Sequence, residues 1–372
     1  MTKLTSIWFW QRFVSPHKSH LAEAIGSLGQ EVTYVANDFM SIERKKMGWS
    51  ASKLKKTKIL IKKTPNALEK LIISLPSNSI HFCQGIRANG LVSYAQKFLT
   101  KRKIKQWLFM EIVEDKGLEG LIKRMVYNFL LNFKQKNING ILAIGSNAET
   151  WYFKRGFDKE KIFPFAYFLS DNLSKIKKSR KHRSTFRFIY VGQLIKRKRV
   201  DFLLSTLSLL RKSIDFELEI IGDGPLHNIL IKQANKLLPG KVKWLGSLQM
   251  KDIPKKIANA DCLVLPSRHD GWGSVISESL MVGTPVICSN TCGASTVVKE
   301  SKIGGVFQAE SISQFKLLLY KVLNNGPISN LKRNRLRKWA KCLGAKEGAK
   351  YLIKILQFHI NQVNRPKPPW IN

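Results

Sequence analysis

The sequence of 372 residues is short of acidic side chains: 25 Asp and Glu face 64 Lys and Arg, which leaves a formal net charge of +39. So large an excess of positive charge calls for an anionic partner, such as nucleic acid, an acidic lipid surface or phosphorylated ligands. A lysine-rich composition with solvated helix faces would give the same totals without a specific partner. The hydrophobic content of 44% is ordinary for a globular protein, and the length allows two domains with separate cores.

Cysteine is also scarce. The five cysteines are odd in number, include no Cys-x-x-Cys pair and lie mostly in apolar runs, so we expect a reducing compartment and no disulfide framework. No window of about 18 uncharged apolar residues exists, which predicts no membrane-spanning helix, and the apolar core of the N-terminus is too short for a signal peptide. We therefore expect a cytoplasmic protein, with any membrane contact peripheral and on the inner face of the cell membrane.

Short apolar runs alternate with helical patterns along the chain, which predicts parallel sheets with crossover helices, the α/β class. The polar and basic segment 171–185 predicts an exposed linker. We expect one domain over residues 1–170 and a second over 186–345, both doubly wound with ligands beyond the carboxyl ends of their strands. Residues 346–372 are expected to form a helix and an extended tail that cross back to the first domain.

The most informative stretch of the sequence runs from residue 266 to residue 286. It follows an apolar run, 262–265, that predicts a buried strand, and a helical pattern begins within it at Val275. Asp270 and Glu278 stand eight residues apart around a Gly-Trp-Gly turn. A glycine turn before a helix start exposes backbone amides and the positive end of the helix dipole, which bind phosphate, and carboxylates bind hydroxyl groups. Phosphate and hydroxyl groups occur together in a nucleotide sugar.

Three earlier strand ends also carry glycine. In chain order they read Tyr190-Val-Gly192-Gln193 with Lys198 downstream, Ile220-Ile-Gly222-Asp223-Gly224-Pro225, and Trp244-Leu-Gly246. Glycine lets a backbone approach a ligand closely, and a lysine reaches a pyrophosphate as a compact, mobile charge. Each motif taken singly also fits a plain turn, a surface lysine or a core tryptophan.

Taken in this order, the motifs resemble the retaining glycosyltransferases of family four, glycosyl transferases group one, of the bacterial surface-polysaccharide type. That family has the GT-B fold, in which two Rossmann-like domains face a central cleft. Its second domain reads Val-Gly-Arg-Leu with a downstream Lys, then Gly-Asp-Gly-Pro, then Glu-x7-Glu around Gly-Phe-Gly. This chain departs from the family where Gln193 replaces Arg, Arg199 replaces Gly, Asp270 replaces Glu and Trp272 replaces Phe.

The resemblance implies a role for each matching residue. Asp270 would bind hydroxyls of the donor sugar, Glu278 the ribose hydroxyls and Lys198 the pyrophosphate, and His81 would face the reacting sugar at a strand end; these four are the implied catalytic residues. The implied donor-binding residues are Gly192, Gln193, Gly222, Gly246, Gly271, Trp272, Gly273, Ser274 and Val275, and the implied acceptor-binding residues are Ser15, Pro16 and His17. The two histidines equally fit hydrogen-bonded structural residues.

The implied reaction transfers a sugar from a UDP- or GDP-sugar to a lipid-linked or polysaccharide acceptor with retained configuration, in synthesis of lipopolysaccharide, O-antigen or capsule. The nucleotide sugar is a co-substrate, so no cofactor is implied, and the lack of an Asp-x-Asp motif implies no bound metal. Two alternatives stay open. One is a basic nucleic-acid-binding protein, which we do not favour because no groove-reading motif is found; the other is a GT-B epimerase or phosphorylase.

Two basic stretches are candidates for contact with an anionic membrane surface, where each Lys or Arg contributes ~1 kcal/mol. Residues 42–63 mix cations with apolar side chains, and residues 121–134 are apolar on most faces with cationic edges. We expect 121–134 to be a core helix of the first domain. Residues 42–63 are therefore the predicted membrane-facing stretch.

Overall fold

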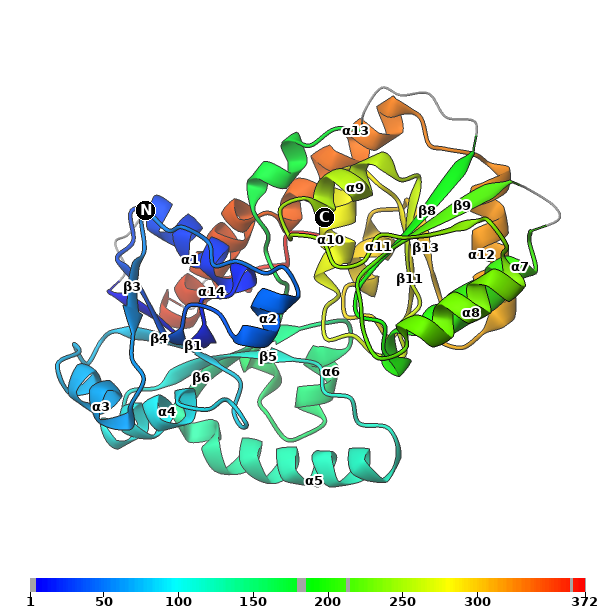
Figure 1. Cartoon of the computed structure of the whole chain (residues 1–372). Helices are drawn as coiled ribbons and strands as arrows, with labels where there is room; N and C mark the ends of the chain where they lie inside the picture. Colours follow the sequence, from blue (N-terminus) through cyan, green and yellow to red (C-terminus); the bar gives the residue numbers. More distant parts are fainter. Residues whose placement is uncertain (1–4, 179–184, 212–214, 362–363, 372) are drawn as a thin grey trace. The chain divides into compact units, whose positions relative to one another are not determined.

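The computed structural model describes residues 5–178, 185–211, 215–361 and 364–371, which form two compact units (Figure 1). The first unit comprises Met1–Lys45, Ser50–Ser170 and Gly344–Pro369, and the second comprises Lys46–Trp49, Asp171–Leu343 and Trp370–Asn372. The whole helix after residue 344 therefore belongs to the first unit, and a short piece of the early chain belongs to the second. Residues 179–184 of the predicted linker lie outside the described residues.

The described part of the first unit contains a seven-stranded parallel sheet in the order β3-β2-β1-β4-β5-β6-β7. In chain order its strands are β1 (Ile7–Phe13), β2 (Val32–Asp38), β3 (Lys58–Ile61), β4 (Ile80–Gln84), β5 (Gln106–Glu111), β6 (Ile138–Ile144) and β7 (Ile162–Phe165). The strand order reverses between β1 and β4, where Trp10 is paired with Cys83. Aromatic rings fill the centre of the unit, with the Phe9 ring 5.3 Å from Phe82 and 5.8 Å from Phe109.

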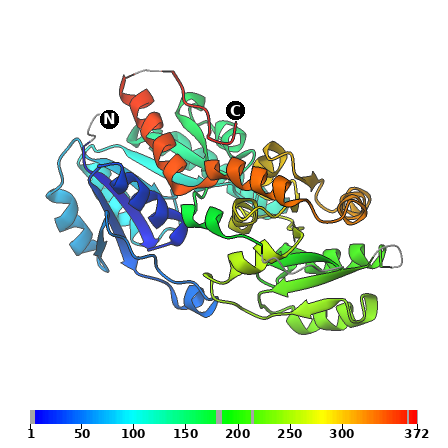
Figure 2. The ribbon, with the colours of Figure 1, turned by 90° about the horizontal axis from the view of Figure 1, so that it is seen from above.

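Helices cover this sheet. They are α1 (Pro16–Ser27), α2 (Ile42–Lys46), α3 (Pro65–Ile73), α4 (Val92–Lys101), α5 (Gly117–Lys134), α6 (Ala148–Phe153) and α14 (Ala345–Asn361), with short 3-10 turns η1 (Gln135–Asn137) and η2 (Lys159–Lys161). The late helix α14 packs beside the early helix α1 (Figure 2). It contacts the sheet through rings, since Tyr351 stacks on Phe165 at 5.9 Å and His359 meets Trp107 at 5.2 Å.

Helix α5 differs from its prediction as a core helix. Only Gly120 and Leu131 of its 18 residues are buried, and its outer side is left uncovered by the described elements of the unit (Figure 1). Conversely, the apolar residues around Ile59 in the stretch 42–63 form the edge strand β3, which pairs with β2. The predicted ranking of the two membrane candidates is therefore not supported by where their apolar side chains lie.

The second unit repeats the architecture with a six-stranded parallel sheet, in the order β10-β9-β8-β11-β12-β13 among the described residues. Its strands are β8 (Phe186–Val191), β9 (Phe216–Ile221), β10 (Val242–Trp244), β11 (Cys262–Leu265), β12 (Val286–Ser289) and β13 (Gly304–Phe307). The chain adds β9 and β10 on one side of β8 and then β11 on the other, so the order reverses between β8 and β11. In such sheets ligands bind beyond the carboxyl ends of the strands at the point of reversal.

The helices of the second unit connect these strands. They are α7 (Val200–Ser208), α8 (His227–Leu237), α9 (Ile253–Asn259), α10 (Ser274–Met281), α11 (Ser295–Glu300), α12 (Ile312–Asn324) and α13 (Asn330–Trp339), with 3-10 turns η3 (Asp171–Lys175), η4 (Lys196–Lys198) and η5 (Ala340–Leu343). Both units therefore show the predicted α/β class. No helix in the described residues is long and apolar enough to cross a bilayer.

A buried arginine ties the far end of α10 to the base of β11. The Arg333 guanidinium is 3% exposed and donates to the carbonyl of Ala260 at 2.7 Å, to Thr284 Oγ1 at 3.1 Å and to the carbonyl of Gly283 at 3.4 Å. It also pairs with the buried Asp261 carboxylate at 3.4 Å. One side chain thus satisfies several polar groups that would otherwise be buried without a partner.

We predict that Arg333→Met lowers the free energy of unfolding by about 3 kcal/mol, because it leaves buried acceptors unsatisfied while keeping the volume. Arg335→Met, on the exposed side of the same helix, is the matched control and is expected to have little effect. Denaturant unfolding followed by tryptophan fluorescence measures both. Equal midpoints for the two variants would contradict this role of Arg333.

Candidate functional site

Glycine turns at the ends of three neighbouring strands are joined to one another. The amide of Gly192, after β8, donates to the carbonyl of Ile221 at 3.0 Å, and the amide of Gly222, after β9, donates to the carbonyl of Gly246 at 2.8 Å. Gly222 has φ +130°, and a Cβ there would stand 2.0 Å from the carbonyl oxygen of Gly192. Only glycine fits at that contact, so the predicted donor-binding glycines form one backbone surface.

The loop after β11 is held on its other side by the segment that follows β12. The amide of Asp270 donates to the carbonyl of Thr291 at 3.2 Å, and the amide of Gly293 donates back to the carbonyl of Asp270 at 2.8 Å. The amide of Ala294 donates to the carbonyl of Trp272 at 2.7 Å. Sequence reasoning missed this supporting segment, for which the glycine after a buried strand was the available signal.

Lys198 and Asp270 meet across the point where the strand order reverses. Lys198 lies in η4 after β8, Asp270 lies in the loop after β11, and the Lys198 ammonium forms an ion pair with Asp270 Oδ2. The side chains are 12% and 16% exposed. Beside them, Arg197 donates to the carbonyl of His269 at 2.6 Å, which fixes the two loops together. An ammonium has three donors, so Lys198 retains capacity for an anionic ligand.

Glu278 is a buried carboxylate in the middle of α10. The helix begins after Gly273, whose φ of +82° makes the left-handed turn that the chain needs there. Glu278 is 9% exposed, and burial raises its pKa to about 7. No described side chain forms an ion pair with it. A carboxylate buried in this way gains from hydroxyl donors supplied by a ligand.

The other predicted donor-binding residues lie along these loops. Ser274 and Val275 form the first turn of α10, at the positive end of the helix dipole. The carbonyl of Gly271 lies close to Gly293, since a Cβ on that glycine would be 1.9 Å from it. Trp272 is 3% exposed, and its Nε1 donates to Ser277 Oγ at 3.0 Å, so its ring packs inside the unit.

A short segment of the early chain lies against the same unit. The carbonyl of Gly48 accepts a hydrogen bond from the amide of Met250 at 3.0 Å, beyond the end of β10. The Sδ atom of Met47 accepts from Gln193 Nε2 at 3.4 Å. The sequence carried no signal for these contacts, because they depend on tertiary structure. They place a thioether beside Gln193, one of the residues that depart from the family pattern.

In the first unit, the predicted acceptor loop begins α1. The carbonyl of Ser15 accepts from the amides of Lys18 and Ser19 at 3.0 and 2.9 Å, and Pro16 occupies the first helical position. The His17 ring stacks on Tyr167, with 5.0 Å between centroids. Burial, followed by the charge of Arg44, lowers the pKa of His17 to about 3, so this histidine is neutral.

Lys18 forms a cluster that the sequence did not reveal. Its side chain is 5% exposed, and Nζ lies over the Phe109 ring at 3.6 Å and the Tyr167 ring at 4.7 Å without a hydrogen-bond partner. The Tyr167 hydroxyl donates to Glu111, at the end of β5. Burial lowers the pKa of Lys18, while the charge of Glu111 opposes that shift. An amine held without a hydrogen-bond acceptor can bind an incoming anionic or hydroxyl group.

His81 requires a correction. It is the second residue of β4, away from the strand's carboxyl end, and it is fully buried. The Trp10 indole donates to His81 Nδ1 at 3.0 Å, and Ser79 Oγ lies 2.8 Å from His81 Nε2. Burial lowers its pKa to about 3. These contacts describe a neutral, hydrogen-bonded core histidine, the alternative that the sequence left open, and they remove His81 from the candidate site.

Among the described residues, no three His, Cys, Asp or Glu side chains come together in an arrangement that holds a metal ion.

The fold is similar to that of solved glycosyltransferases. The Anabaena protein Alr3699/HepE, solved in complex with UDP, superposes with a TM-score of 0.72 over 95% of this chain and 100% of that one, at 14% identity. At this identity the likeness establishes the fold, and it confirms the predicted GT-B class.

Two curated relatives are more similar in sequence over shorter segments. An uncharacterized protein in the cps region of Klebsiella pneumoniae is 25% identical over 59% of this chain and 62% of its own length. The uncharacterized glycosyltransferase MJ1178 of Methanocaldococcus jannaschii is 26% identical over 37% of this chain and 38% of its own. The chain thus spans less than two thirds of the length of these relatives.

The family model described as glycosyl transferases group 1 matches residues 171–342. Those residues contain the strand-end glycines, the Lys198–Asp270 pair and Glu278, and they coincide with the main segment of the second unit, Asp171–Leu343. The match confirms, for residues 171–342, the family predicted from the motifs: this part of the chain is similar to the glycosyl transferases group 1.

Proposed function

We propose that the protein is a retaining glycosyltransferase that moves a sugar from a nucleotide-sugar donor to a lipid-linked or polysaccharide acceptor of a cell-surface glycan, such as lipopolysaccharide, O-antigen or capsule. The ion pair of Lys198 with Asp270, at the strand-order reversal of the family-matched unit, carries the proposal. The UDP bound by the Anabaena protein favours a UDP-sugar over a GDP-sugar. The cps-region relative favours a surface glycan.

In this proposal the donor binds to the second unit. Lys198 and the first amides of α10 stabilise the diphosphate, because a cation and a helix N-terminus both attract negative charge. Asp270 accepts hydrogen bonds from hydroxyls of the sugar, and Glu278 accepts them from the ribose. The glycine turn at Gly246 borders the base. The nucleotide sugar supplies the reactive bond, and the proposal requires no further cofactor.

The proposed reaction exchanges one bond for another on the same face of the sugar. The bond from the anomeric carbon to the β-phosphate oxygen breaks, and a bond to the acceptor hydroxyl oxygen forms. The acceptor proton moves to an oxygen of the departing phosphate, so the protein needs no dedicated base. Stabilisation of the diphosphate by Lys198 lowers the barrier because negative charge develops there in the transition state.

The acceptor is assigned to the cluster of the first unit. Ser15, Pro16 and His17 form the start of α1, and Lys18 and Glu111 lie close to the carboxyl ends of β1 and β5. A bound phosphate of a lipid-linked acceptor would favour the protonated form of Lys18, which then matches it in charge. We assign an anionic membrane surface as the second partner, at the inner face of the cell membrane, because a net charge of +39 favours it. We assign no nucleic-acid partner.

The carboxylates of the donor site are tested by Asp270→Asn and Glu278→Gln. We expect each to lower the rate of sugar transfer by about 100-fold or more, since each removes charged contacts to the donor. Glu300→Gln, at an exposed helix end, is the matched control. Transfer is followed by nucleoside diphosphate release with a membrane extract as acceptor source. Near-wild-type rates in both site variants would contradict the assignment of Asp270 and Glu278 to the donor site.

The acceptor cluster is tested by Lys18→Met, which keeps most of the buried volume and removes the cation. We expect the KM for acceptor to rise by about tenfold while the KM for donor stays unchanged. The melting temperature should stay the same or rise, because a buried amine without a hydrogen-bond partner is costly. Lys97→Met, at an exposed position of α4, is the control. An unchanged acceptor KM would refute this role for Lys18.

A further inference from the structure

We propose that α5 is the element by which this protein docks on an anionic lipid bilayer. Its apolar side chains face outward: the exposed fractions of Leu118, Met125, Phe129 and Phe133 are 84%, 65%, 68% and 66%. Leu121 and Ile122 are also exposed. A helix that exposes so many large apolar residues along its length marks an interaction surface.

These six residues share one side of the helix. With 3.6 residues per turn, their positions fall within an arc of about 120°. Gly120 and Leu131, the two buried residues of α5, lie on the opposite side. That opposite side also packs Tyr127, Leu130 and Leu131 on the core, so α5 presents one apolar side to its own unit and a second to solvent.

The helix is held firmly in this orientation. Asp115, just before α5, accepts a hydrogen bond from Trp151 Nε1 at 2.8 Å and pairs with Arg155 at 3.2 Å, both from the α6 region. Arg124, in the second turn of α5, donates to the carbonyl of Asp115 at 2.6 Å. The Tyr127 ring packs edge-on against Trp151 at 5.2 Å. These contacts fix the buried side, so the exposed apolar side is a property of the folded unit.

Charge distinguishes a bilayer from other occupants. Between residues 116 and 136 the chain has five Lys or Arg and one Glu. A second copy of this chain would bring another +39 against the same surface, and like charges oppose that contact. An anionic bilayer offers both headgroups for the cations and an apolar layer for the side chains. A helix of 18 residues is about 27 Å long, and amphipathic helices of this kind lie in the plane of the membrane interface.

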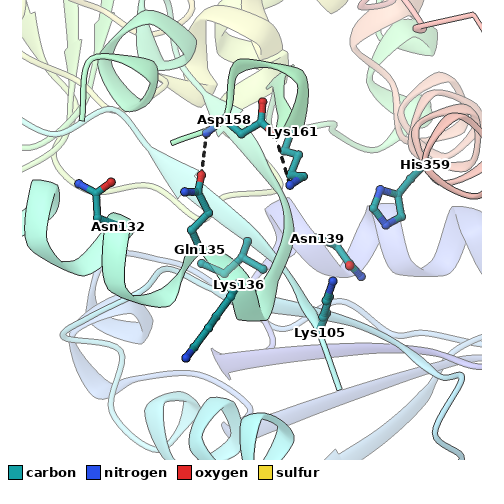
Figure 3. A pocket seen from close by; sticks show the side chains of 9 residues that line it. Lys105, Asn132, Gln135, Lys136, Asn139, Asp158, Lys161 and His359 are labelled. Atoms are coloured by element: carbon teal, nitrogen blue, oxygen red, sulfur yellow. Dashed lines mark hydrogen bonds and ion pairs between the residues drawn. The ribbon is translucent and has the colours of Figure 1, made fainter. Parts of the chain in front are cut away.

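A basic hollow adjoins the carboxyl end of α5 (Figure 3). It has a volume of about 390 Å³, and its lining includes Lys105, Lys136, Lys161 and His359. Lys161 is partly neutralised by Asp158 at 3.3 Å. Burial, then the charges of Lys105 and Lys161, lower the pKa of His359, which is the response expected at a positive site. The hollow adds basic side chains beyond Phe133, and their charge matches that of anionic headgroups.

This inference deepens the proposed function and rests on it for its purpose. Residues 112–116 join the carboxyl end of β5, which bears Glu111, directly to the start of α5. The proposed acceptor cluster therefore lies near one end of the docking helix. A bilayer bound along α5 would hold lipid-linked acceptors close to that cluster.

The experiment is flotation of the full chain with vesicles of phosphatidylcholine alone or mixed with phosphatidylglycerol. We expect the wild type to float with the mixed vesicles, less so at high salt because screening weakens headgroup contacts. Met125→Glu with Phe129→Glu should weaken binding by about tenfold or more. The control pair is Leu317→Glu with Leu331→Glu, which are 66% and 61% exposed in the second unit; it adds the same charge and should bind as the wild type.

Two further measurements separate the outcomes. Equal flotation of the α5 variant and the wild type would overturn the proposal. So would a wild type that does not float but forms a dimer in sedimentation that the α5 variant loses, because a second copy would then cover the helix. UDP binding, measured by thermal shift on every variant, should not change. If no variant, nor the wild type, binds UDP while the wild type still floats with the mixed vesicles, the proposed donor site is overturned and the proposed docking role of α5 is not.

Discussion

The ion pair between Lys198 and Asp270 joins the two halves of the second sheet where its strand order reverses. Parallel strands bring their carboxyl ends to one edge, so loops far apart in sequence become neighbours there. The glycine turns seal that edge through backbone hydrogen bonds, and the segment after β12 supports the Asp270 loop from behind. Glu278 is buried within this framework, and burial raises its pKa.

Much of this arrangement could be predicted because it is local. The runs before Gly192, Gly222 and Asp270 are apolar and end in glycine or a charged turn, and each forms a strand whose end lies at the site. The predicted role of His81 at the site was wrong because a sequence does not show where in a strand a residue lies. Its hydrogen-bond partner Trp10 comes from another strand. Lys18 was missed because its surroundings, Phe109 and Tyr167, come from distant parts of the chain.

The orientation of α5 also depends on tertiary contacts that the sequence does not show. Its apolar pattern predicted a helix, and the helix exists, but periodicity gives the direction of an apolar face only relative to the polar face of the same helix. Which side packs on the sheet depends on Asp115 and its contacts with Trp151 and Arg155. The excess of positive charge is ambiguous in the sequence. Our proposals give it two partners, an anionic bilayer at α5 and a diphosphate at Lys198.

The most direct test of the donor site is the pH dependence of UDP binding, measured by titration calorimetry from about pH 5 to about pH 9 for the wild type and Glu278→Gln. In the proposed donor site ionised Glu278 accepts hydrogen bonds from the ribose. On that proposal, wild-type affinity should be full above the Glu278 pKa of about 7 and fall as the pH drops through it. The variant reports the titration of the phosphate alone, whose own pKa is about 6. We predict that the wild type loses about tenfold more affinity than the variant across this range. Superimposable profiles, or no UDP binding at any pH, would contradict the account.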